Sequence, residues 1–176
     1  KMSHKSGFVN IIGSPNVGKS TLMNQLVGEK LSIITSKMQT TRHRIMGMVN
    51  EEDYQIVFSD TPGIIDPHYR LHENMMRFVS EALKDADVIL MVTDIYEDPN
   101  KMEDRLAQIN KLSVPILLLL NKIDNSEQKS LEKLVNEWKI KLPTAEILPI
   151  SALHKMSIQL ILPKILEWLP ENPPYF

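Results

Sequence analysis

A glycine-rich stretch near the N-terminus has the residues and the spacing of a phosphate-binding turn. Residues 13–20 read Gly-Ser-Pro-Asn-Val-Gly-Lys-Ser and match the pattern G-x-x-x-x-G-K-[ST]. Glycines let the backbone curl so that successive N–H groups converge on phosphate oxygens, and the N-terminus of a following helix adds its positive dipole end. In such a turn Lys19 reaches the β- and γ-phosphates, and the hydroxyl of Ser20 ligates Mg²⁺. The predicted phosphate site comprises Gly13, Ser14, Pro15, Asn16, Val17, Gly18, Lys19, Ser20 and Thr21.

A second motif supplies groups that can distinguish one base from another. Asn121, Lys122 and Asp124 directly follow an apolar run, which places them at the end of an expected strand. The Asp124 carboxylate can accept hydrogen bonds from both N1–H and the 2-amino group of guanine, whereas adenine would leave it unpaired. We expect Asn121 to tie this loop to the phosphate-binding turn and the stem of Lys122 to cover the base. A backbone N–H of Ser151–Ala152 is expected to meet the guanine oxygen.

A third stretch, Asp60-Thr-Pro-Gly63, has groups suited to the metal and to the terminal phosphate. We expect Asp60 to act on Mg²⁺ through a water molecule and Gly63 to donate its N–H to the γ-phosphate. The next residue is Ile64, where well-known GTP-hydrolysing switches have a glutamine that orients the attacking water. An isoleucine side chain can neither orient water nor stabilise charge.

Two interpretations of Ile64 remain open. In one, hydrolysis is lost and the chain binds its partners in a nucleotide-dependent way. In the other, the Asn16 amide oxygen and backbone carbonyls of residues 36–38 ligate K⁺ between the α- and γ-phosphates. The cation would then stand where an arginine finger otherwise places its charge. A simpler role for Asn16 is to brace the turn through local hydrogen bonds, and Arg42 or a partner's arginine is a further candidate.

Short apolar runs alternate with longer helical patterns, which is typical of an α/β fold with a mostly parallel sheet. Polar residues 50–53 join two runs of strand formers, so these two strands are expected to form an antiparallel hairpin. Apolar residues from Leu71 to Leu83 recur at helical spacing and predict a helix between Arg70 and Lys84. The other expected strands and helices are strands 8–12, 46–50, 54–59, 88–92, 116–120 and 147–150, and helices 19–27, 102–112, 131–140 and 158–169.

Length and composition are those of one ordinary globular domain. The 176 residues are 43% hydrophobic and carry a net charge of -2, so the overall charge does not predict non-specific binding to nucleic acid. The absence of cysteine excludes disulfides and thiolate metal sites and suits a reducing cytosol. The longest apolar run, 114–120, contains a proline and is too short to span a bilayer. Three prolines within residues 170–176 predict a stiff linker after a domain of residues 1–169.

Together the motifs resemble those of the small GTPases. Residues 13–20, 40–41, 60–63, 121–124 and 151–152 occupy the five motif positions of that class in order, over essentially the whole chain. The resemblance implies a P-loop GTPase (Ras-like) α/β fold, a three-layer sandwich. Its sheet would have about six mostly parallel strands, one antiparallel strand and helices on both faces. It also implies a Mg²⁺ ion held by Ser20, a threonine and, through water, Asp60. We prefer Thr41 to Thr40, because Thr41 matches the second threonine of the related Thr-Thr-Arg motif.

Within that class the chain is similar to the Era family of bacterial ribosome-assembly GTPases. The similarity rests on Pro15-Asn16, on Asp60-Thr-Pro-Gly63 and on Gln39-Thr-Thr-Arg-His-Arg44. His43 stands where the related Der and MnmE families have an aspartate, which favours Era. The Pro-rich end also favours Era, because Era proteins pass at this point into an RNA-binding KH domain.

The resemblance implies a cytoplasmic bacterial switch that hydrolyses GTP slowly with Mg²⁺, with K⁺ stimulation if Asn16 acts as above. Lys19, Thr41, Gly63 and Asn16 are the residues expected to act on the reaction. The GTP form would promote binding of 16S rRNA and the 30S subunit through the KH domain, which these residues do not include. We expect a monomer, and peripheral association with the inner membrane has no support in the chain. The alternatives are a nucleotide-gated RNA- or ribosome-binding module with incidental hydrolysis, and an Era-like GTPase acting in tRNA modification.

Overall fold

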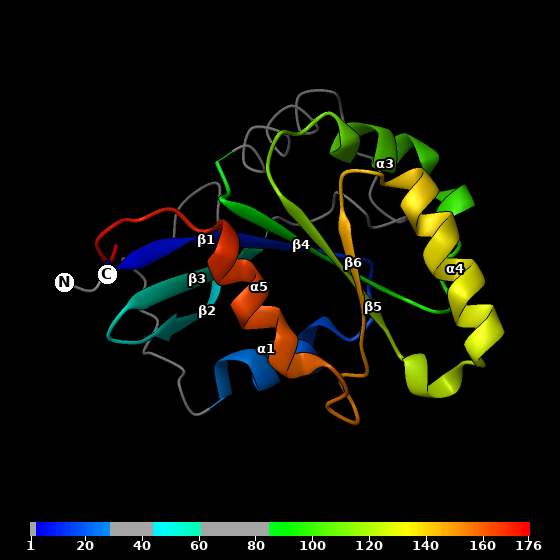
Figure 1. Cartoon of the computed structure of the whole chain (residues 1–176), viewed down its shortest axis with the longest axis horizontal. Coiled ribbons are helices and arrows are strands. Elements are labelled where there is room, and N and C mark those ends of the chain that lie inside the picture. The colour runs from blue at the N-terminus through cyan, green and yellow to red at the C-terminus, as the bar shows by residue number, and fades with distance from the viewer. Residues whose placement is uncertain (1–2, 29–43, 61–84) are drawn as a thin grey trace.

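The structure of the protein is a computed structural model that describes residues 3–28, 44–60 and 85–176. These residues form strands and helices that alternate along most of the chain (Figure 1). The strands are β1 (Lys5–Ile12), β2 (Arg44–Asn50), β3 (Tyr54–Asp60), β4 (Val88–Asp94), β5 (Ile116–Asn121) and β6 (Glu146–Pro149). The helices are α1 (Lys19–Val27), α3 (Glu103–Asn110), α4 (Gln128–Lys141) and α5 (Ile161–Trp168). Short 3₁₀ turns cover Pro99–Lys101, Ile123–Asn125 and Ile158–Leu160.

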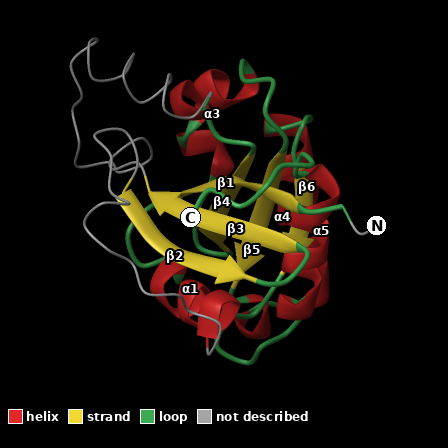
Figure 2. Ribbon diagram, turned by 90° about the vertical axis from the view of Figure 1, so that its left-hand side faces the viewer, coloured by secondary structure: helices red, strands yellow, loops and turns green. Residues whose placement is uncertain are grey.

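The six strands form one sheet in the order β2-β3-β1-β4-β5-β6. All neighbouring pairs are parallel except β2 and β3, which form the predicted antiparallel hairpin (Figure 2). The chain leaves β1 toward β2 and β3 on one side and then crosses to β4 on the other. Crevices for ligands form at the carboxyl ends of strands where the winding reverses in this way. The phosphate-binding turn, which directly follows β1, therefore lies at this reversal.

Helices cover both faces of the sheet, so the fold has three layers (Figure 1). On one face α1 and α5 pack against alternate residues of the central strands, with Leu22 and Ile165 fully buried. On the other face α3 and α4 pack through Leu106 and Trp138. Strands β4 and β5 are buried along their whole length, as expected for parallel strands covered on both faces. The predicted three-layer α/β fold is confirmed.

The expected elements are confirmed with small differences at their ends. Strand β1 begins at Lys5 rather than at residue 8, because its ladder with β3 starts at the pair Lys5–Tyr54. The helix expected at 158–169 is a 3₁₀ turn followed by α5, which begins at Ile161. Pro163 explains this difference, since it has no N–H to extend the α-helical pattern backward. The helix expected between Arg70 and Lys84 lies outside the described residues.

The Pro-rich segment lies against the amino ends of β1 and β3. The backbone N–H of Ser6 donates to Pro170 O, and the Ser6 hydroxyl donates to Pro173 O at 2.5 Å. Oε1 of the buried Gln55 accepts the backbone N–H groups of Tyr175 and Phe176. Residues 170–176 are therefore bound at the amino ends of two inner strands, opposite the phosphate-binding turn at the carboxyl end of β1.

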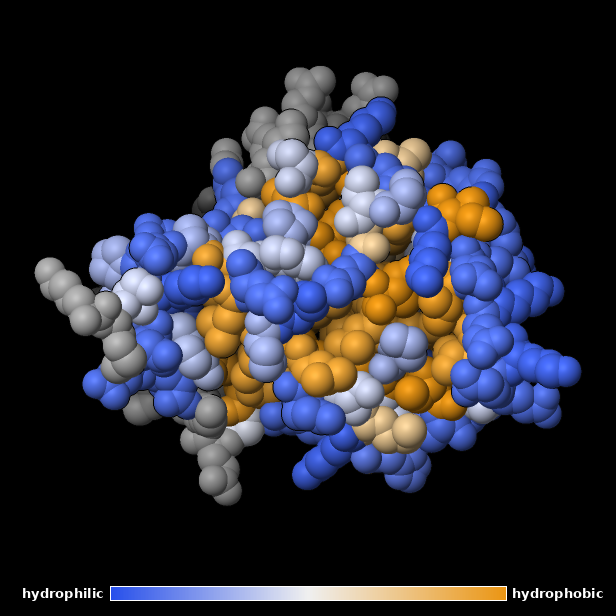
Figure 3. Space-filling view, in the orientation of Figure 1, coloured by the Kyte–Doolittle hydropathy of each residue, from blue (hydrophilic) through white to orange (hydrophobic). Residues whose placement is uncertain are grey.

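Strand β6 borders the sheet beside an apolar groove. The space-filling view shows apolar side chains gathered between α5 and α4 (Figure 3). The groove there measures about 320 Å³ and is lined partly by Leu117, Leu148 and Leu160. In the part of the chain that the structure describes, no helix is both long and apolar enough to cross a membrane.

Candidate functional site

The phosphate-binding turn needs glycine at two positions. A Cβ on Gly13 would stand 2.6 Å from the backbone oxygen of Val92, so only glycine lets the turn pack this closely on β4. Gly18 has a φ of 101°, a left-handed conformation that favours glycine, and it directly precedes α1. No side chain caps the first turn of α1, so its backbone N–H groups are left for a ligand. This arrangement is a suitable site for an anion such as phosphate.

The polar side chains of this turn separate into two groups. Lys19 and Ser20 belong to the first turn of α1. The Lys19 ammonium donates to Gly13 O at 2.9 Å, and Ser20 is exposed. Ser14 is buried instead, and its hydroxyl donates to Glu97 Oε2 at 2.7 Å. Ser14 and the buried Val17 can therefore contact a phosphate only through their backbone groups.

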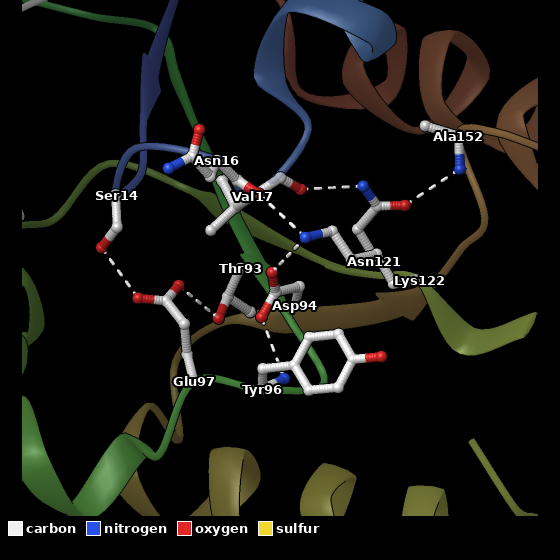
Figure 4. Close-up of polar contacts among 10 residues, drawn as sticks. All are labelled: Ser14, Asn16, Val17, Thr93, Asp94, Tyr96, Glu97, Asn121, Lys122 and Ala152. Atoms are coloured by element: carbon white, nitrogen blue, oxygen red, sulfur yellow. Dashed lines mark hydrogen bonds and ion pairs between the residues drawn. The ribbon is translucent and has the colours of Figure 1, made fainter. Parts of the chain in front are cut away.

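Asn121 joins the predicted base-reading loop to the phosphate-binding turn (Figure 4). Its Nδ2 donates to Val17 O at 2.8 Å, and its Oδ1 accepts the Ala152 N–H at 2.9 Å. Asn121 ends β5 and is only 3% exposed, so both hydrogen bonds are shielded from water. The predicted tie between the two loops is present, and a third loop, after β6, is held by the same amide.

Lys122 crosses the site as a second link. Its Nζ lies 2.8 Å from Asp94 Oδ2, donates to Asn16 O at 2.8 Å, and stands 5.6 Å from the centre of the Tyr96 ring. The backbone of Lys122 is left-handed, with a φ of 67°, which turns the chain from β5 into the following 3₁₀ turn. The lysine stem therefore passes along the cavity with its charged end fixed at both sides.

Asp124 presents its carboxylate to the same cavity. Oδ1 accepts from the Ser151 hydroxyl at 2.8 Å, and Oδ2 lies 3.4 Å from His154 Nε2. The Asp124 side chain is 17% exposed, so it remains partly open to a ligand. These contacts orient a hydrogen-bond acceptor toward the position where a purine edge would lie.

The predicted base-reading residues enclose a cavity of about 300 Å³. Six of its lining residues were predicted from the sequence: Gly18, Thr21, Asn121, Lys122, Asp124 and Ala152. A backbone N–H of Ser151–Ala152 was expected to meet the guanine oxygen, but the Ala152 N–H is donated to Asn121 Oδ1 and the Ser151 N–H to Met156 O. A base oxygen at this position would have to share one of these N–H groups with its present acceptor.

Asp60 ends β3 close to β1, where a metal beside the terminal phosphates would be expected. Its side chain is 11% exposed, and its Oδ2 accepts from Arg44 at 2.6 Å. Magnesium prefers hard oxygen ligands and is held by few protein groups together with phosphates and water. The Ser20 hydroxyl and the Asp60 carboxylate fit that donor set. The described residues include no group of three or more acidic or histidine ligands that would form a self-sufficient metal cage.

Of the other residues predicted for the site, the structure describes Pro15 and Asn16 but not Thr41 or Gly63. Pro15 and Asn16 are exposed at the tip of the turn. Asn16 has a φ of 69°, and its amide points away from Lys122 (Figure 4). No bracing hydrogen bond from this amide is found among the described residues. Thr41 and Gly63, predicted for the metal and the γ-phosphate, lie outside the described residues, as do Thr40 and Ile64.

Five residues of the site were missed by sequence reasoning. Tyr96, Asn125 and Leu153 line the cavity and are exposed, Asp94 fixes Lys122, and Glu97 holds Ser14. Asp94 could have been found, because it ends a buried parallel strand and so lies on the edge where the other motifs meet. Tyr96, Glu97 and Leu153 have no such signal, since they belong to irregular loops.

The sheet order, the phosphate-binding turn after β1 and the base-reading loop after β5 define a P-loop GTPase fold. The family profile described as "50S ribosome-binding GTPase" matches residues 8–122. GTPase Era of Alkaliphilus metalliredigens is 44% identical over 99% of this chain and 60% of its own length. The chain therefore belongs to this family of GTPases and, within it, has the G domain of the Era type.

Two solved Era structures share the fold. One is Era in complex with MgGDPNP and nucleotides 1506–1542 of 16S ribosomal RNA, with a TM-score of 0.75 at 40% identity. It is matched over 98% of this chain and 60% of its own. The other is a variant of Aquifex aeolicus Era bound to GDP and AlF₄⁻, with a TM-score of 0.74 at 39% identity over the same shares of the two chains. The chain thus spans about 60% of the length of the relatives it matches.

Proposed function

We propose that the chain binds GTP and GDP between the phosphate-binding turn and the base-reading loop, and that it hydrolyses GTP. The observation that carries this proposal is the cavity of about 300 Å³ in which Asp124, Lys122 and Gly18 converge. The phosphates would follow the turn to Lys19 and the first N–H groups of α1. Adenine is disfavoured because its edge offers no pair of donors to the Asp124 carboxylate.

The metal proposed for this site is Mg²⁺, held by Ser20 and Thr41 directly and by Asp60 through water. Bound there, it would neutralise charge that develops on the transferred phosphoryl group. Lys19 would neutralise the β- and γ-phosphates, and the Gly63 N–H would orient the γ-phosphate. The structure of the Era relative with MgGDPNP supports the choice of metal and nucleotide.

Asn16 is proposed as a ligand of K⁺, which would compensate for the missing glutamine at residue 64. The proposal is supported by an exposed amide without a hydrogen bond among the described residues. Measuring GTP hydrolysis in K⁺ and Na⁺ buffers of equal ionic strength tests it. Because the φ of Asn16 is 69°, the appropriate variant is Asn16→Gly, which removes the amide and keeps the backbone.

We expect K⁺ to accelerate hydrolysis in the wild type and to lose this effect in Asn16→Gly. Asn24→Ala, at an exposed position of α1, is the matched control and should retain the effect. Equal, slow rates in both salts would contradict the K⁺ role. They would favour the second candidate, a nucleotide-gated binding module with incidental hydrolysis.

The cellular process proposed for the chain is maturation of the small ribosomal subunit in the bacterial cytoplasm. Residues 1–169 would form the G domain, and residues 170–176 would lead to an RNA-binding KH domain. The Era relative in complex with a 16S rRNA fragment supports this proposal. An Era-like role in tRNA modification is the alternative, and binding of the full-length protein to isolated 30S subunits or to tRNA separates the two.

Guanine selectivity is the most direct test of the proposed site. Asp124→Asn exchanges an acceptor for a donor, so GDP binding should weaken on the order of 100-fold while xanthosine diphosphate binding improves. Asp104→Asn, on the exposed face of α3, is the control and should bind GDP like the wild type. Equal loss of both nucleotides in Asp124→Asn would mean that Asp124 supports the loop and does not read the base.

A further inference from the structure

Arg44 and Asp60 form an ion pair at the proposed metal site. The two residues are also partners in the β2–β3 ladder, so the contact joins the first residue of β2 to the last residue of β3. Arg44 Nη2 lies 2.6 Å from Asp60 Oδ2. The Asp60 side chain is 11% exposed and that of Arg44 is 69% exposed. The guanidinium therefore occupies one oxygen of a carboxylate that has little exposure to solvent.

A hydrated divalent cation would need the same carboxylate. Its water molecules require an accessible acceptor oxygen, and little of the Asp60 side chain is exposed beside the guanidinium. Two cations that share one carboxylate also repel each other at short range. Arg44 and the metal are therefore expected to compete for Asp60.

Loss of the Arg44–Asp60 contact is expected to loosen the start of β2, because few ladder positions hold it. The register of the β2–β3 ladder shifts between Ile45 and Gly47, so only Arg44 and Ile45 extend the pairing beyond the irregularity. A strand end held by so few ladder positions depends more on its side-chain contacts. In the sequence Arg44 follows directly on residues 40–43, which include the proposed metal ligand Thr41.

We propose that Arg44 is a positioning residue that competes with hydrated Mg²⁺ for Asp60. Metal binding thus releases Arg44, the first residue of β2, from its contact with Asp60 at the end of β3. The inference rests on the proposed function, because it takes Asp60 as the residue that holds the metal through water.

The test is the Mg²⁺ dependence of the release of a fluorescent GDP analogue. Removing the competitor in Arg44→Gln should lower the free Mg²⁺ concentration that half-maximally slows release. The expected shift is about two- to fivefold, which is the range for an ion pair with one exposed partner. Arg44→Lys keeps the charge and should lie between the wild type and Arg44→Gln. Lys133→Gln makes the same charge change on the exposed face of α4 and should leave the midpoint unchanged.

An unchanged or higher Mg²⁺ midpoint in Arg44→Gln would overturn the inference, and a higher one would mean that Arg44 supports Asp60 for the metal. Failure of the proposed function has a different result, because the wild type would then not bind the analogue or would release it independently of Mg²⁺. A second measurement needs only the wild type. The Nε–H signal of Arg44 in the GDP complex should shift when Mg²⁺ is added, and its insensitivity to Mg²⁺ would also overturn the inference.

Discussion

Replacing Asn121 by alanine tests whether one amide holds the three loops of the site together. The substitution removes the donor to Val17 O and the acceptor of the Ala152 N–H. Both backbone groups are buried, and Asn121 itself is 3% exposed. Leaving one buried polar group unpaired costs about 1–3 kcal/mol, so two cost about 2–6 kcal/mol before any relaxation.

Water lowers this cost in the nucleotide-free protein. Asn121 lines the cavity of about 300 Å³, from which a water molecule can enter the space left by the amide. We therefore expect the free energy of unfolding to fall by about 2–3 kcal/mol. For a domain of this size the melting temperature should fall by about 4–12 °C. Bound nucleotide would exclude that water, so GDP affinity should fall in addition to stability.

Urea denaturation of the nucleotide-free protein measures the first effect, and calorimetric titration with GDP measures the second. Asn110→Ala is a matched control, because this asparagine donates a single bond, at 2.8 Å, to Lys141 O. It ends α3 and leads toward the amino end of β5, away from the cavity. Asn110→Ala should cost about 1 kcal/mol and leave GDP affinity unchanged. A loss below about 0.5 kcal/mol for Asn121→Ala would refute the bridging role.

Three further predictions concern packing and charge. Gly18→Ala should abolish GDP binding in a calorimetric titration, because its φ is 101° and a Cβ there would collide with Asn121 Nδ2. Trp138→Ala should lower the free energy of unfolding by about 3–5 kcal/mol in urea denaturation. Trp138→Phe should cost far less, because Nε1 has no hydrogen-bond partner within the described residues. Burial raises the pKa of Asp87 above 3.8, against a lowering by the Phe8 N–H, so its charged form is disfavoured in the folded state. Asp87→Asn should therefore be more stable than the wild type at neutral pH, and urea midpoints should show that advantage shrinking as the pH falls through the raised pKa.

Much of the fold could be read from local patterns. The apolar run at residues 116–120 and the polar residues 50–53 predicted β5 and the β2–β3 hairpin because strand formation and tight turns depend on neighbouring residues. Proline at position 163 shifted the start of α5, an effect visible in the sequence but overlooked beside the helical periodicity. The first and last residues of the strands were less predictable, because pairing with the neighbouring strand determines where each strand begins and ends.

The candidate site was predictable in its residue types and less so in its contacts. The spacing of the phosphate-binding turn and of residues 121–124 indicated which side chains meet, because carboxyl ends of parallel strands share one edge. Tertiary structure decided their partners: Lys122 with Asp94, Ser14 with Glu97, and the Ala152 N–H with Asn121.

The sequence by itself determined the α/β class, the order of the motifs and the family, because these depend on residue type and spacing along the chain. Only the tertiary structure decided that Arg44 pairs with Asp60 and that residues 170–176 lie against the amino ends of β1 and β3. Such contacts join residues far apart in sequence or on different strands, and sheet register sets them. The periodicity of apolar residues along a strand shows which face of the sheet a side chain occupies. The pairing register between strands determines which polar group on the neighbouring strand lies beside it.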